Sequence, residues 1–487
     1  MPRLLSAFLL SVLVLAGCVS NPATGGRNVA MGSMQSEREQ ARRYYEEIIR
    51  AYGLYEDQAV QDYVNRVGQR VARHSHLPDD EWKFVVLDDE SINAFTTGGN
   101  YIYVHRGLLV YLNSEAELAT VLGHEIGHVT ARHPARRQTR AMGASILATA
   151  AAIATGSNAV AQLANIGATA WLQGYGRENE MEADRLGLEY AAKSGYRPEA
   201  MAETFKVFKS QESFEVARAR AEGREPRIYH GVFSSHPAPD ARVIQAVKGS
   251  ANIQEPPGGW VDNRDEYLHT IDGMPFGSSR KQGIVRNNRM YHADLGITIA
   301  FPKDWTVENQ HERILAYTRD KDAIMQITLD ARPDNKSPRE FLLEKLRGAQ
   351  LSGGEAVSSN GMDGYAVLTR TGSPLDGGQG PVRWVALYRD KQVYVFGGAS
   401  RSAVDTRPEA DRVILSIVQT LRSLKPAEYP LAEPYRVRIV KADASTRLDQ
   451  YAREMPVEKH QKEELQLLNA LYPNRDPDPG QLLKVVE

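Results

Sequence analysis

The sequence predicts an α+β chain in three folded parts: a mainly helical domain with a small β-sheet, then an α/β domain, then a small C-terminal module. In the first half, apolar residues such as Val64, Val67 and Val71 recur at helical spacing. After Tyr291 the pattern changes to short apolar runs such as 297–301, which are typical of strands. Stretches rich in proline and glycine separate the two regimes. We expect the mainly helical domain over 35–272, a linker over 273–290, the α/β domain over 291–426 and the C-terminal module over 433–487.

Each part has its own expected elements. Proline cannot continue a helix, so Pro134 should end the last helix of the run in the first part. A glycine-rich turn at 98–100 introduces the second strand. The first part is expected to contain helices 35–55, 58–74, 108–111 and 115–133, with strands 82–87 and 101–104. The α/β domain is expected to contain strands 297–301, 324–329, 364–369, 384–388 and 392–396, with helices 338–350 and 407–421. The last module should be bounded by strands 435–440 and 482–485.

Length and composition indicate a globular protein of two or three domains and argue against a nucleic-acid-binding protein. A chain of 487 residues with 42% hydrophobic and 25% charged residues can bury a substantial core in two or three domains. The formal net charge is −2, and no Lys/Arg cluster with interleaved aromatic residues is present. Nucleic acid is therefore not an expected partner.

The N-terminal residues are typical of an export signal. One cation, Arg3, precedes an apolar run over 4–15, which is shorter than the roughly 18 residues that span a bilayer. Residues 15–18 (Leu-Ala-Gly-Cys) resemble the bacterial lipobox, in which the cysteine is lipidated. This resemblance implies a signal peptide over 1–17, a lipid on Cys18 and a tether over 18–34. Cys18 is the only cysteine, so the chain has no internal disulfide. An incidental or buried cysteine is the alternative.

The segment HEIGH at 124–128 contains the candidate metal ligands and the candidate general base. Four residues advance about 400° on an α-helix, so His124 and His128 project from one face and can bind the same ion. Glu125 lies about 100° around the helix, beside the ion, where it can act as general base. Gly123 and Gly127 are expected to leave space for a metal and a substrate. Two ordinary histidines on a surface helix are the alternative.

A catalytic zinc site needs a third protein ligand. His133 is one candidate, but Ala131 and Pro134 do not match the glycine and histidine of a three-histidine pattern, so a structural role at the helix end is expected for it. The acidic segment 178–184 supplies the other candidates. Helical spacing pairs Glu180 with Asp184 on one face and Glu178 with Glu182 on another. A solvated acidic face remains open on spacing alone.

HEIGH at 124–128 together with NEMEAD at 179–184 resembles the forty-eighth metallopeptidase family, zinc gluzincins that include the HtpX, CAAX prenyl protease, BepA and LoiP types. The resemblance extends over about 35–250. It implies a gluzincin-type peptidase domain with one zinc ion per chain, held by His124, His128 and Glu180. It also implies that Asp184 orients a zinc-bound histidine.

Two further expectations come from the same resemblance. Segment 93–104 is expected to form an edge strand that pairs with extended substrate backbone, which would place Asn93, Ala94, Phe95, Gly99 and Tyr101 in contact with substrate. An ordinary hairpin is the alternative. His236, in a Ser-His-Pro segment, is expected near the zinc, where it would hold the enzyme latent or stabilise an oxyanion. A merely structural loop histidine is the alternative.

The C-terminal half contains no second catalytic constellation. Residues 297–425 resemble PsbP-like domains, which implies an accessory domain over 291–426. Residues 436–484 resemble a degenerate LysM module, a type that binds peptidoglycan, although 442–445 (Ala-Asp-Ala-Ser) replaces the usual Gly-Asp-Thr turn. A purely structural cap is the alternative for this module.

The sequence therefore predicts a zinc-dependent endopeptidase of protein quality control, using metal-activated water with Glu125 as general base. Its expected partners are misfolded or unassembled envelope proteins, the membrane through the lipid on Cys18, and peptidoglycan as a candidate. By resemblance to Gram-negative lipoproteins, Val19 after the lipidated cysteine favours the outer membrane, facing the periplasm. The alternative is a non-proteolytic envelope assembly factor or cell-wall-binding scaffold with a latent zinc site.

Overall fold

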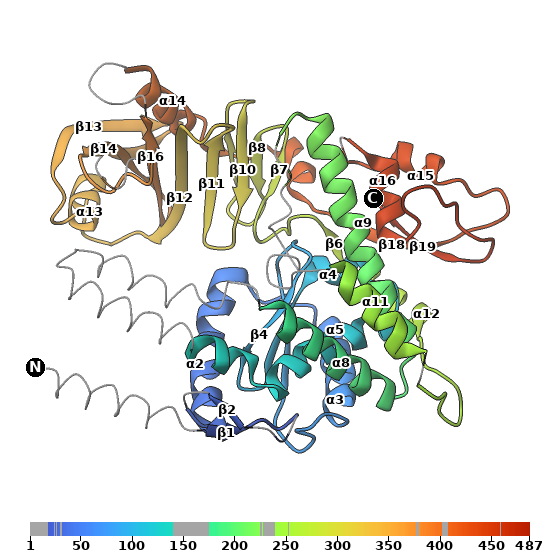
Figure 1. Cartoon of the computed structure of the whole chain (residues 1–487). Helices are drawn as coiled ribbons and strands as arrows, with labels where there is room; N and C mark the ends of the chain where they lie inside the picture. The colour runs from blue at the N-terminus through green and yellow to red at the C-terminus, as the bar shows by residue number, and fades with distance from the viewer. Residues whose placement is uncertain are drawn as a thin grey trace, which may run out of the picture. The chain divides into compact units, whose positions relative to one another are not determined.

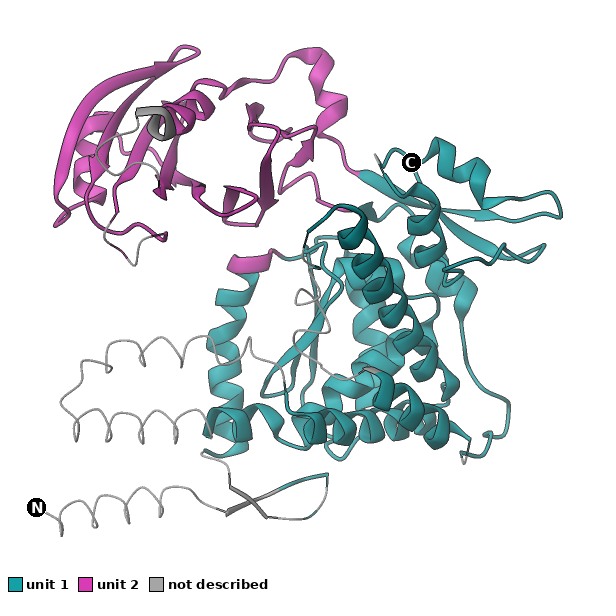
Figure 2. Ribbon diagram, turned by 45° about the horizontal axis from the view of Figure 1, so that its top comes forward, with its two compact units in different colours: residues 1–49, 54–276, 435–487 teal, residues 50–53, 277–434 magenta. Residues whose placement is uncertain are grey.

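The structure is a computed structural model of the chain (Figure 1). It describes residues 18–23, 25, 27–29, 32–139, 175–224, 226, 239–251, 253–375, 378, 380–401, 408–457 and 459–487. Helices and several sheets are both present, so the mixed α+β class is confirmed. The chain divides into two compact units, shown in different colours in Figure 2. Unit 1 comprises residues 1–49, 54–276 and 435–487, and unit 2 comprises 50–53 and 277–434.

Unit 1 is mainly helical around one small sheet. The sheet has the order β3-β5-β4, in which β3 and β5 are parallel and β4 is antiparallel to β5. Its described elements are β1 (Cys18–Ser20), β2 (Arg27–Val29), α2 (Met34–Tyr52), α3 (Gln58–Ala72), β3 (Lys83–Leu87), β4 (Ala94–Gly98), β5 (Tyr101–His105), α4 (Arg106–Tyr111), α5 (Glu115–Thr130), α8 (Arg177–Lys193), α9 (Glu199–Ala221), α11 (Pro239–Ser250), α12 (Arg264–Ile271), β6 (Pro275–Phe276), β18 (Tyr435–Lys441), α15 (Leu448–Glu454), α16 (Gln461–Leu468) and β19 (Leu482–Val486).

One large apolar core links the helices of unit 1, and a smaller cluster lies within residues 442–483. Val64 and Val67 of α3, Leu122 and Ile126 of α5, and Leu186 of α8 all belong to it. The apolar stripe that predicted α3 therefore faces the same core as the helix that carries HEIGH. Because all sixteen residues of α5 are buried, this helix lies in the interior and its polar side chains are held by their neighbours.

Residues 435–487 join this core. β18 pairs with β19 and also with β6, and Leu465 and Leu468 of α16 are fully buried in the apolar cluster that contains α5. The buried ammonium group of Lys484 donates to the carbonyl oxygens of Val110 and Leu112 at 2.8 and 2.7 Å. The predicted LysM-like module thus lies in one compact unit with the helical domain, and its LysM identity stays a prediction.

Unit 2 is built on antiparallel sheets. A seven-stranded sheet has the order β10-β11-β12-β16-β15-β14-β13, and a four-stranded sheet has the order β17-β9-β8-β7. Its elements are β7 (Ile284–Arg286), β8 (Arg289–His292), β9 (Ile297–Ala300), β10 (Trp305–Asn309), β11 (Arg313–Thr318), β12 (Ala323–Ala331), α13 (Pro338–Lys345), β13 (Leu351–Ser359), β14 (Met362–Thr369), β15 (Val382–Arg389), β16 (Gln392–Ser400), α14 (Pro408–Gln419), β17 (Arg422–Ser423) and the 3₁₀ helix η3 (Pro426–Ala432).

Helices α13 and α14 cover opposite faces of the seven-stranded sheet. Alternate residues of β15 point to opposite faces, and Val385 packs in the cluster of Ile414 on α14, while Ala386 packs in the cluster of Leu342 on α13. Every strand pair of this unit among the described residues is antiparallel. The domain is therefore not α/β in the strict sense, which requires a mainly parallel sheet.

Most predicted elements are present, with ends that differ by a few residues. The helix expected over 115–133 ends at Thr130, before Pro134, and the stretch expected as a linker over 273–290 contains β6, β7 and the start of β8. Strands β10, β11 and β13 were not predicted. Each has only one buried residue and is otherwise half-buried or exposed, so these strands lack the apolar runs that identified the other strands.

Among the described residues, no helix combines the length and the apolar character needed to cross a bilayer.

Candidate metal centre

Helix α5 is fixed at its start by its own side chains. Ser114 is the N-cap and accepts a hydrogen bond from the Glu117 backbone N–H at 3.2 Å. The Glu117 carboxylate in turn accepts from the backbone N–H of Asn113 at 2.7 Å. These bonds satisfy donors that the first turn of a helix leaves open. The helix therefore begins at a defined residue, and the positions of His124 and His128 along it are set.

Glycines bring α8 against α5. A Cβ atom at Gly123 would lie 2.7 Å from the carbonyl oxygen of Gly187, and one at Gly127 would lie 2.9 Å from that of Ala183. A Cβ at Gly187 would lie 2.6 Å from the backbone nitrogen of His124. The expectation that Gly123 and Gly127 leave space for metal and substrate is therefore wrong. They let the two helices approach closely enough for α8 side chains to reach the histidines.

Three potential ligand groups converge at this contact. The Nε2 atoms of His124 and His128 are 2.9 Å apart. Glu180, from α8, places its carboxylate oxygens 3.6 Å from His124 Nε2 and 3.4 Å from His128 Nε2. One ligand atom from each residue lies within 4.8 Å of the others, and all three residues are buried. Two imidazole nitrogens and one carboxylate oxygen are a donor set that suits catalytic zinc, so these residues can hold a metal ion.

Other side chains occupy the far sides of these groups. The Asp184 carboxylate lies 2.8 Å from His124 Nδ1, which directs Nε2 toward the ligand cluster. Arg242 of α11 donates to Asp184 from Nε and Nη2, both at 2.7 Å, and its Nη1 lies 3.0 Å from Glu180. Burial alone would raise the pKa of Asp184, but Arg242 and His124 hold it below its ordinary value. Asp184 therefore remains an anion, able to accept from His124.

His128 is also enclosed, by the rings of His133 and Tyr175. Its Nδ1 lies 2.8 Å from Nδ1 of His133, and the Tyr175 ring stacks on its imidazole at 4.0 Å between centroids and 21° between planes. Burial, together with the charges that His124 and His133 would carry, lowers the pKa of His128, against the opposing effect of Glu180. His128 is thus held in the neutral form that metal binding requires.

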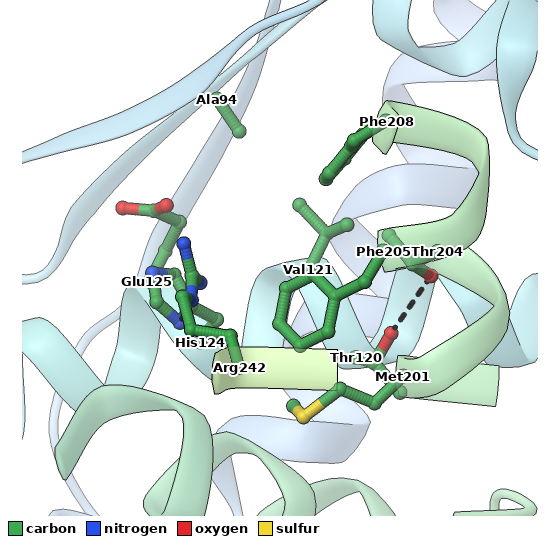
Figure 3. A pocket seen from close by; sticks show the side chains of 10 residues that line it. All are labelled: Ala94, Thr120, Val121, His124, Glu125, Met201, Thr204, Phe205, Phe208 and Arg242. Carbon is green, nitrogen blue, oxygen red and sulfur yellow. Dashed lines mark hydrogen bonds between the residues drawn. The ribbon is translucent and has the colours of Figure 1, made fainter. Parts of the chain in front are cut away.

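A small pocket lies beside these groups. Figure 3 shows His124, Glu125 and Arg242 on one side of it and Phe205 and Phe208 of α9 on the other. The pocket has a volume of about 30 Å³ and a largely apolar lining. Its lining residues are Ala94, Thr120, Val121, His124, Glu125, Met201, Thr204, Phe205, Phe208 and Arg242. Glu125 therefore borders both the ligand cluster and a space that accepts a small apolar group.

Of the predicted substrate-binding residues, one lines the pocket and others pack against neighbouring parts of the domain. β4 is an edge of its sheet, pairing in the described part of the chain with β5 alone, and Ala94 at its start lines the pocket. Phe95 stacks on Tyr103 at 5.0 Å. Gly99 has a φ of 59°, and a Cβ there would lie 2.6 Å from the Glu37 carbonyl oxygen, so tight packing in the turn explains this glycine. Contact of substrate with Asn93, Ala94, Phe95, Gly99 and Tyr101 stays a prediction.

Two other predicted site residues cannot be placed beside the cluster. His236 lies outside the described residues. Cys18 is the first residue of β1. Their predicted roles, near the zinc and as a lipidation site, stay predictions.

Sequence reasoning did not assign roles in this site to Arg242, Tyr175 or His133. Arg242 is 58 residues from Asp184, and no helical or strand period links positions so far apart. His133 was weighed as a ligand and given a structural role. The structure places its ring nitrogens against His128 and Glu182, so it supports the site without joining the ligand cluster.

A second cavity lies in unit 2, between β8 and β9 on one side and β10, β11, β12 and β16 on the other. Its volume is about 430 Å³. Ile297, Ile299, Ile327 and Phe396 contribute its apolar surface, and Lys281 and Arg313 are among its polar lining residues. This size falls within the range of small-molecule pockets.

Comparisons with known proteins agree with the site. Residues 58–250 match peptidase family M48. The chain is 31% identical over 214 residues to the beta-barrel assembly-enhancing protease of Escherichia coli, covering 42% of this chain and 41% of that protein. It is 34% identical over 221 residues to the putative beta-barrel assembly-enhancing protease of Vibrio cholerae, covering 44% and 43%. It is 34% identical over 146 residues to the mitochondrial metalloendopeptidase OMA1 of Arabidopsis thaliana, covering 30% and 29%.

The chain spans less than half the length of each of these relatives. Among solved structures, cyanobacterial PsbP from Synechocystis matches 29% of this chain and 96% of its own, at 12% identity and a TM-score of 0.22. A score at this level carries no weight, so the PsbP-like domain stays a prediction. The segment 58–250, which matches the family, contains His124, Glu125, His128 and Glu180, and all four residues are buried. Residues 58–250 therefore resemble a domain of peptidase family M48, and the candidate metal centre lies within them.

Proposed function

We propose that the chain is a zinc-dependent endopeptidase that cleaves misfolded or unassembled envelope proteins. One observation carries this proposal. His124, His128 and Glu180 converge in the interior, while Glu125, on the same helix as both histidines, borders the cluster and an apolar pocket. A polypeptide chain with one small apolar side chain in that pocket would bring its backbone beside Glu125.

Different residues have different roles in peptide hydrolysis. A zinc ion on His124, His128 and Glu180 would supply the Lewis acidity that polarises the scissile carbonyl and acidifies water. The Glu125 carboxylate accepts the proton of the attacking water and then delivers it to the leaving amine nitrogen. Asp184 and Arg242 keep His124 and Glu180 oriented, which preserves the site geometry throughout the reaction.

Two features support a broad preference for unfolded chains. β4 offers an edge to which an extended peptide can add as a further strand, and this mode depends mainly on backbone hydrogen bonds. The pocket of about 30 Å³ is bordered on one side by Met201, Phe205 and Phe208, so it fits a small apolar side chain. We expect cleavage sites to share a small apolar residue on one side of the cut.

The test compares the full chain with its Glu125→Gln variant on unfolded outer-membrane protein and on casein. Loss of the general base should reduce cleavage by a factor of about 100 or more, while zinc content stays equal because Glu125 is not a ligand. Mass spectrometry of the products gives the cleavage sites. Equal cleavage rates in both proteins would defeat the proposal.

The setting is proposed as the periplasmic face of the outer membrane of a Gram-negative bacterium, with a lipid on Cys18. The lipobox-like residues 15–18 support the anchor. Two of the relatives are named for assisting β-barrel assembly, which supports envelope proteins as substrates. Mass analysis of the protein purified from membranes should find acyl chains on Cys18 and none in a Cys18→Ala variant.

The competing function is a non-proteolytic assembly factor or a scaffold that binds the cell wall through its C-terminal parts. The cavity of about 430 Å³ in unit 2 favours some binding role for that unit. A complementation experiment in cells that lack the native chain distinguishes the two functions. If Glu125→Gln restores envelope assembly as fully as the wild-type chain does, the binding role accounts for the function.

A further inference from the structure

The chain turns back sharply after helix α5. Arg132 adopts a left-handed conformation, with φ of 57°, which is uncommon for a residue with a side chain. Its fully buried guanidinium donates to the Glu37 carboxylate and to the carbonyl oxygen of Gly32 at 2.9 Å. These bonds fix the turn. As a result His133 lies beneath His128, and its side chain is completely buried.

A hydrogen-bond chain runs from this turn to α8. His133 Nδ1 lies 2.8 Å from His128 Nδ1, and His133 Nε2 lies 3.1 Å from the Glu182 carboxylate. Nε2 of His128 faces His124 and Glu180 and is the nitrogen available to a metal. A neutral His128 that binds a metal through Nε2 must carry its proton on Nδ1, where it donates to Nδ1 of His133. His133 then carries its own proton on Nε2 and donates to Glu182.

We infer that His133 and Glu182 form a hydrogen-bond relay, which orients His128 and increases its affinity for a metal ion. Asp184 does the same for His124 through a direct contact. This inference rests on the proposed function, because it assumes that His128 is a metal ligand. Each donor in the chain meets one acceptor, and the chain ends on a carboxylate. That arrangement fixes the tautomers of both rings and increases the electron density at His128 Nε2.

The relay gives the two ligand histidines different supports. His124 meets a buried aspartate directly, whereas His128 reaches its carboxylate through a second ring. The Glu182 side chain is 23% exposed and also lies 3.5 Å from Arg136, so it remains in contact with solvent at the edge of the site. His133 and Glu182 are positioning residues, since neither is among the metal-ligating atoms.

The test measures zinc affinity in the full-length chain by competition with a chromogenic chelator. His133→Leu removes both hydrogen bonds, His133→Asn keeps an acceptor near His128 but cannot reach Glu182, and Glu182→Gln keeps an acceptor without the charge. We expect His133→Leu to weaken zinc binding by about 10–100-fold, with the other two variants intermediate. Glu178→Gln, which changes an exposed carboxylate on the same helix, is the matched control and should bind zinc like the wild type.

A residue that only filled space would change the stability of the metal-free protein without this ranking of affinities. Thermal unfolding without metal therefore accompanies each titration. If the buried His133 variants do not fold, Glu182→Gln decides alone, because its side chain is partly exposed. Wild-type affinity in folded His133→Asn and Glu182→Gln would overturn the relay and leave the peptidase proposal standing. A wild-type chain that binds no zinc would overturn both.

Discussion

At the scale of single residues, Glu180 completes the candidate metal centre. Its side chain is fully buried and contacts His124, His128 and Arg242. Such a carboxylate is stable in the interior only when cations or hydrogen-bond donors compensate it. Arg242 supplies one positive charge, but it also binds Asp184, so two carboxylates share one guanidinium. One negative charge therefore remains, and a bound divalent cation would more than offset it.

We predict that Glu180→Ala lowers bound zinc from about one ion per chain to near zero, because two histidines alone leave the ion with too few protein ligands. Glu178→Ala serves as control, since that side chain is exposed and lies outside the cluster. Elemental analysis after dialysis against chelator-free buffer measures both. Equal zinc content in the two variants would show that the third ligand was wrongly assigned.

Local spacing explains which of these residues could be predicted. His124 and His128 are one helical turn apart, and Glu180 and Asp184 are likewise one turn apart, so each pair was visible in the sequence. Spacing alone left open whether the acidic pair met the histidines. Arg242 and Tyr175 contact the site from distant segments, so only the fold identifies them.

At the scale of elements, the contact between α5 and α8 determines whether the ligands meet. Both helices were predictable from local sequence, but their separation was not. The glycines beside the histidines suggested open space, whereas they form the surface on which α8 rests. A close helix pair depends on small residues at the crossing on both helices, and this requirement spans 64 residues from Gly123 to Gly187.

We predict that Gly187→Ala destabilises unit 1 by about 1–3 kcal/mol, because the added methyl would lie 2.6 Å from the His124 nitrogen and force the helices apart. The same displacement should weaken zinc binding. Gly176→Ala is the comparison: nothing lies within 4 Å of a Cβ there, so the change alters only the N-cap of α8 and should cost less. Denaturant unfolding and chelator competition measure the two effects. A Gly187→Ala chain as stable as the Gly176→Ala chain would mean that the helices are not in close contact.

At the scale of the whole molecule, the C-terminal residues belong to the same compact unit as the candidate metal centre, although they are far from it in sequence. The sequence prediction treated 433–487 as a separate module, since two strands should bound it and residues 436–484 resemble a LysM module. The structure instead pairs β18 with β6 and buries Leu468 in the core that contains α5. Long-range strand pairing and shared burial leave no local trace in a single sequence, so this grouping could not be predicted.

We predict that Leu468→Ala, which removes a fully buried side chain, lowers the unfolding midpoint of the same transition that zinc raises. The expected loss is about 2–5 kcal/mol. Zinc stabilises the transition of the unit that binds it, so the response to zinc identifies unit 1 in a calorimetric scan. Leu342→Ala, an equally buried leucine of unit 2, is the control and should leave that transition unchanged. If Leu468→Ala instead shifts a transition that zinc does not affect, residues 435–487 fold as an independent module and the shared core does not couple them to the metal centre.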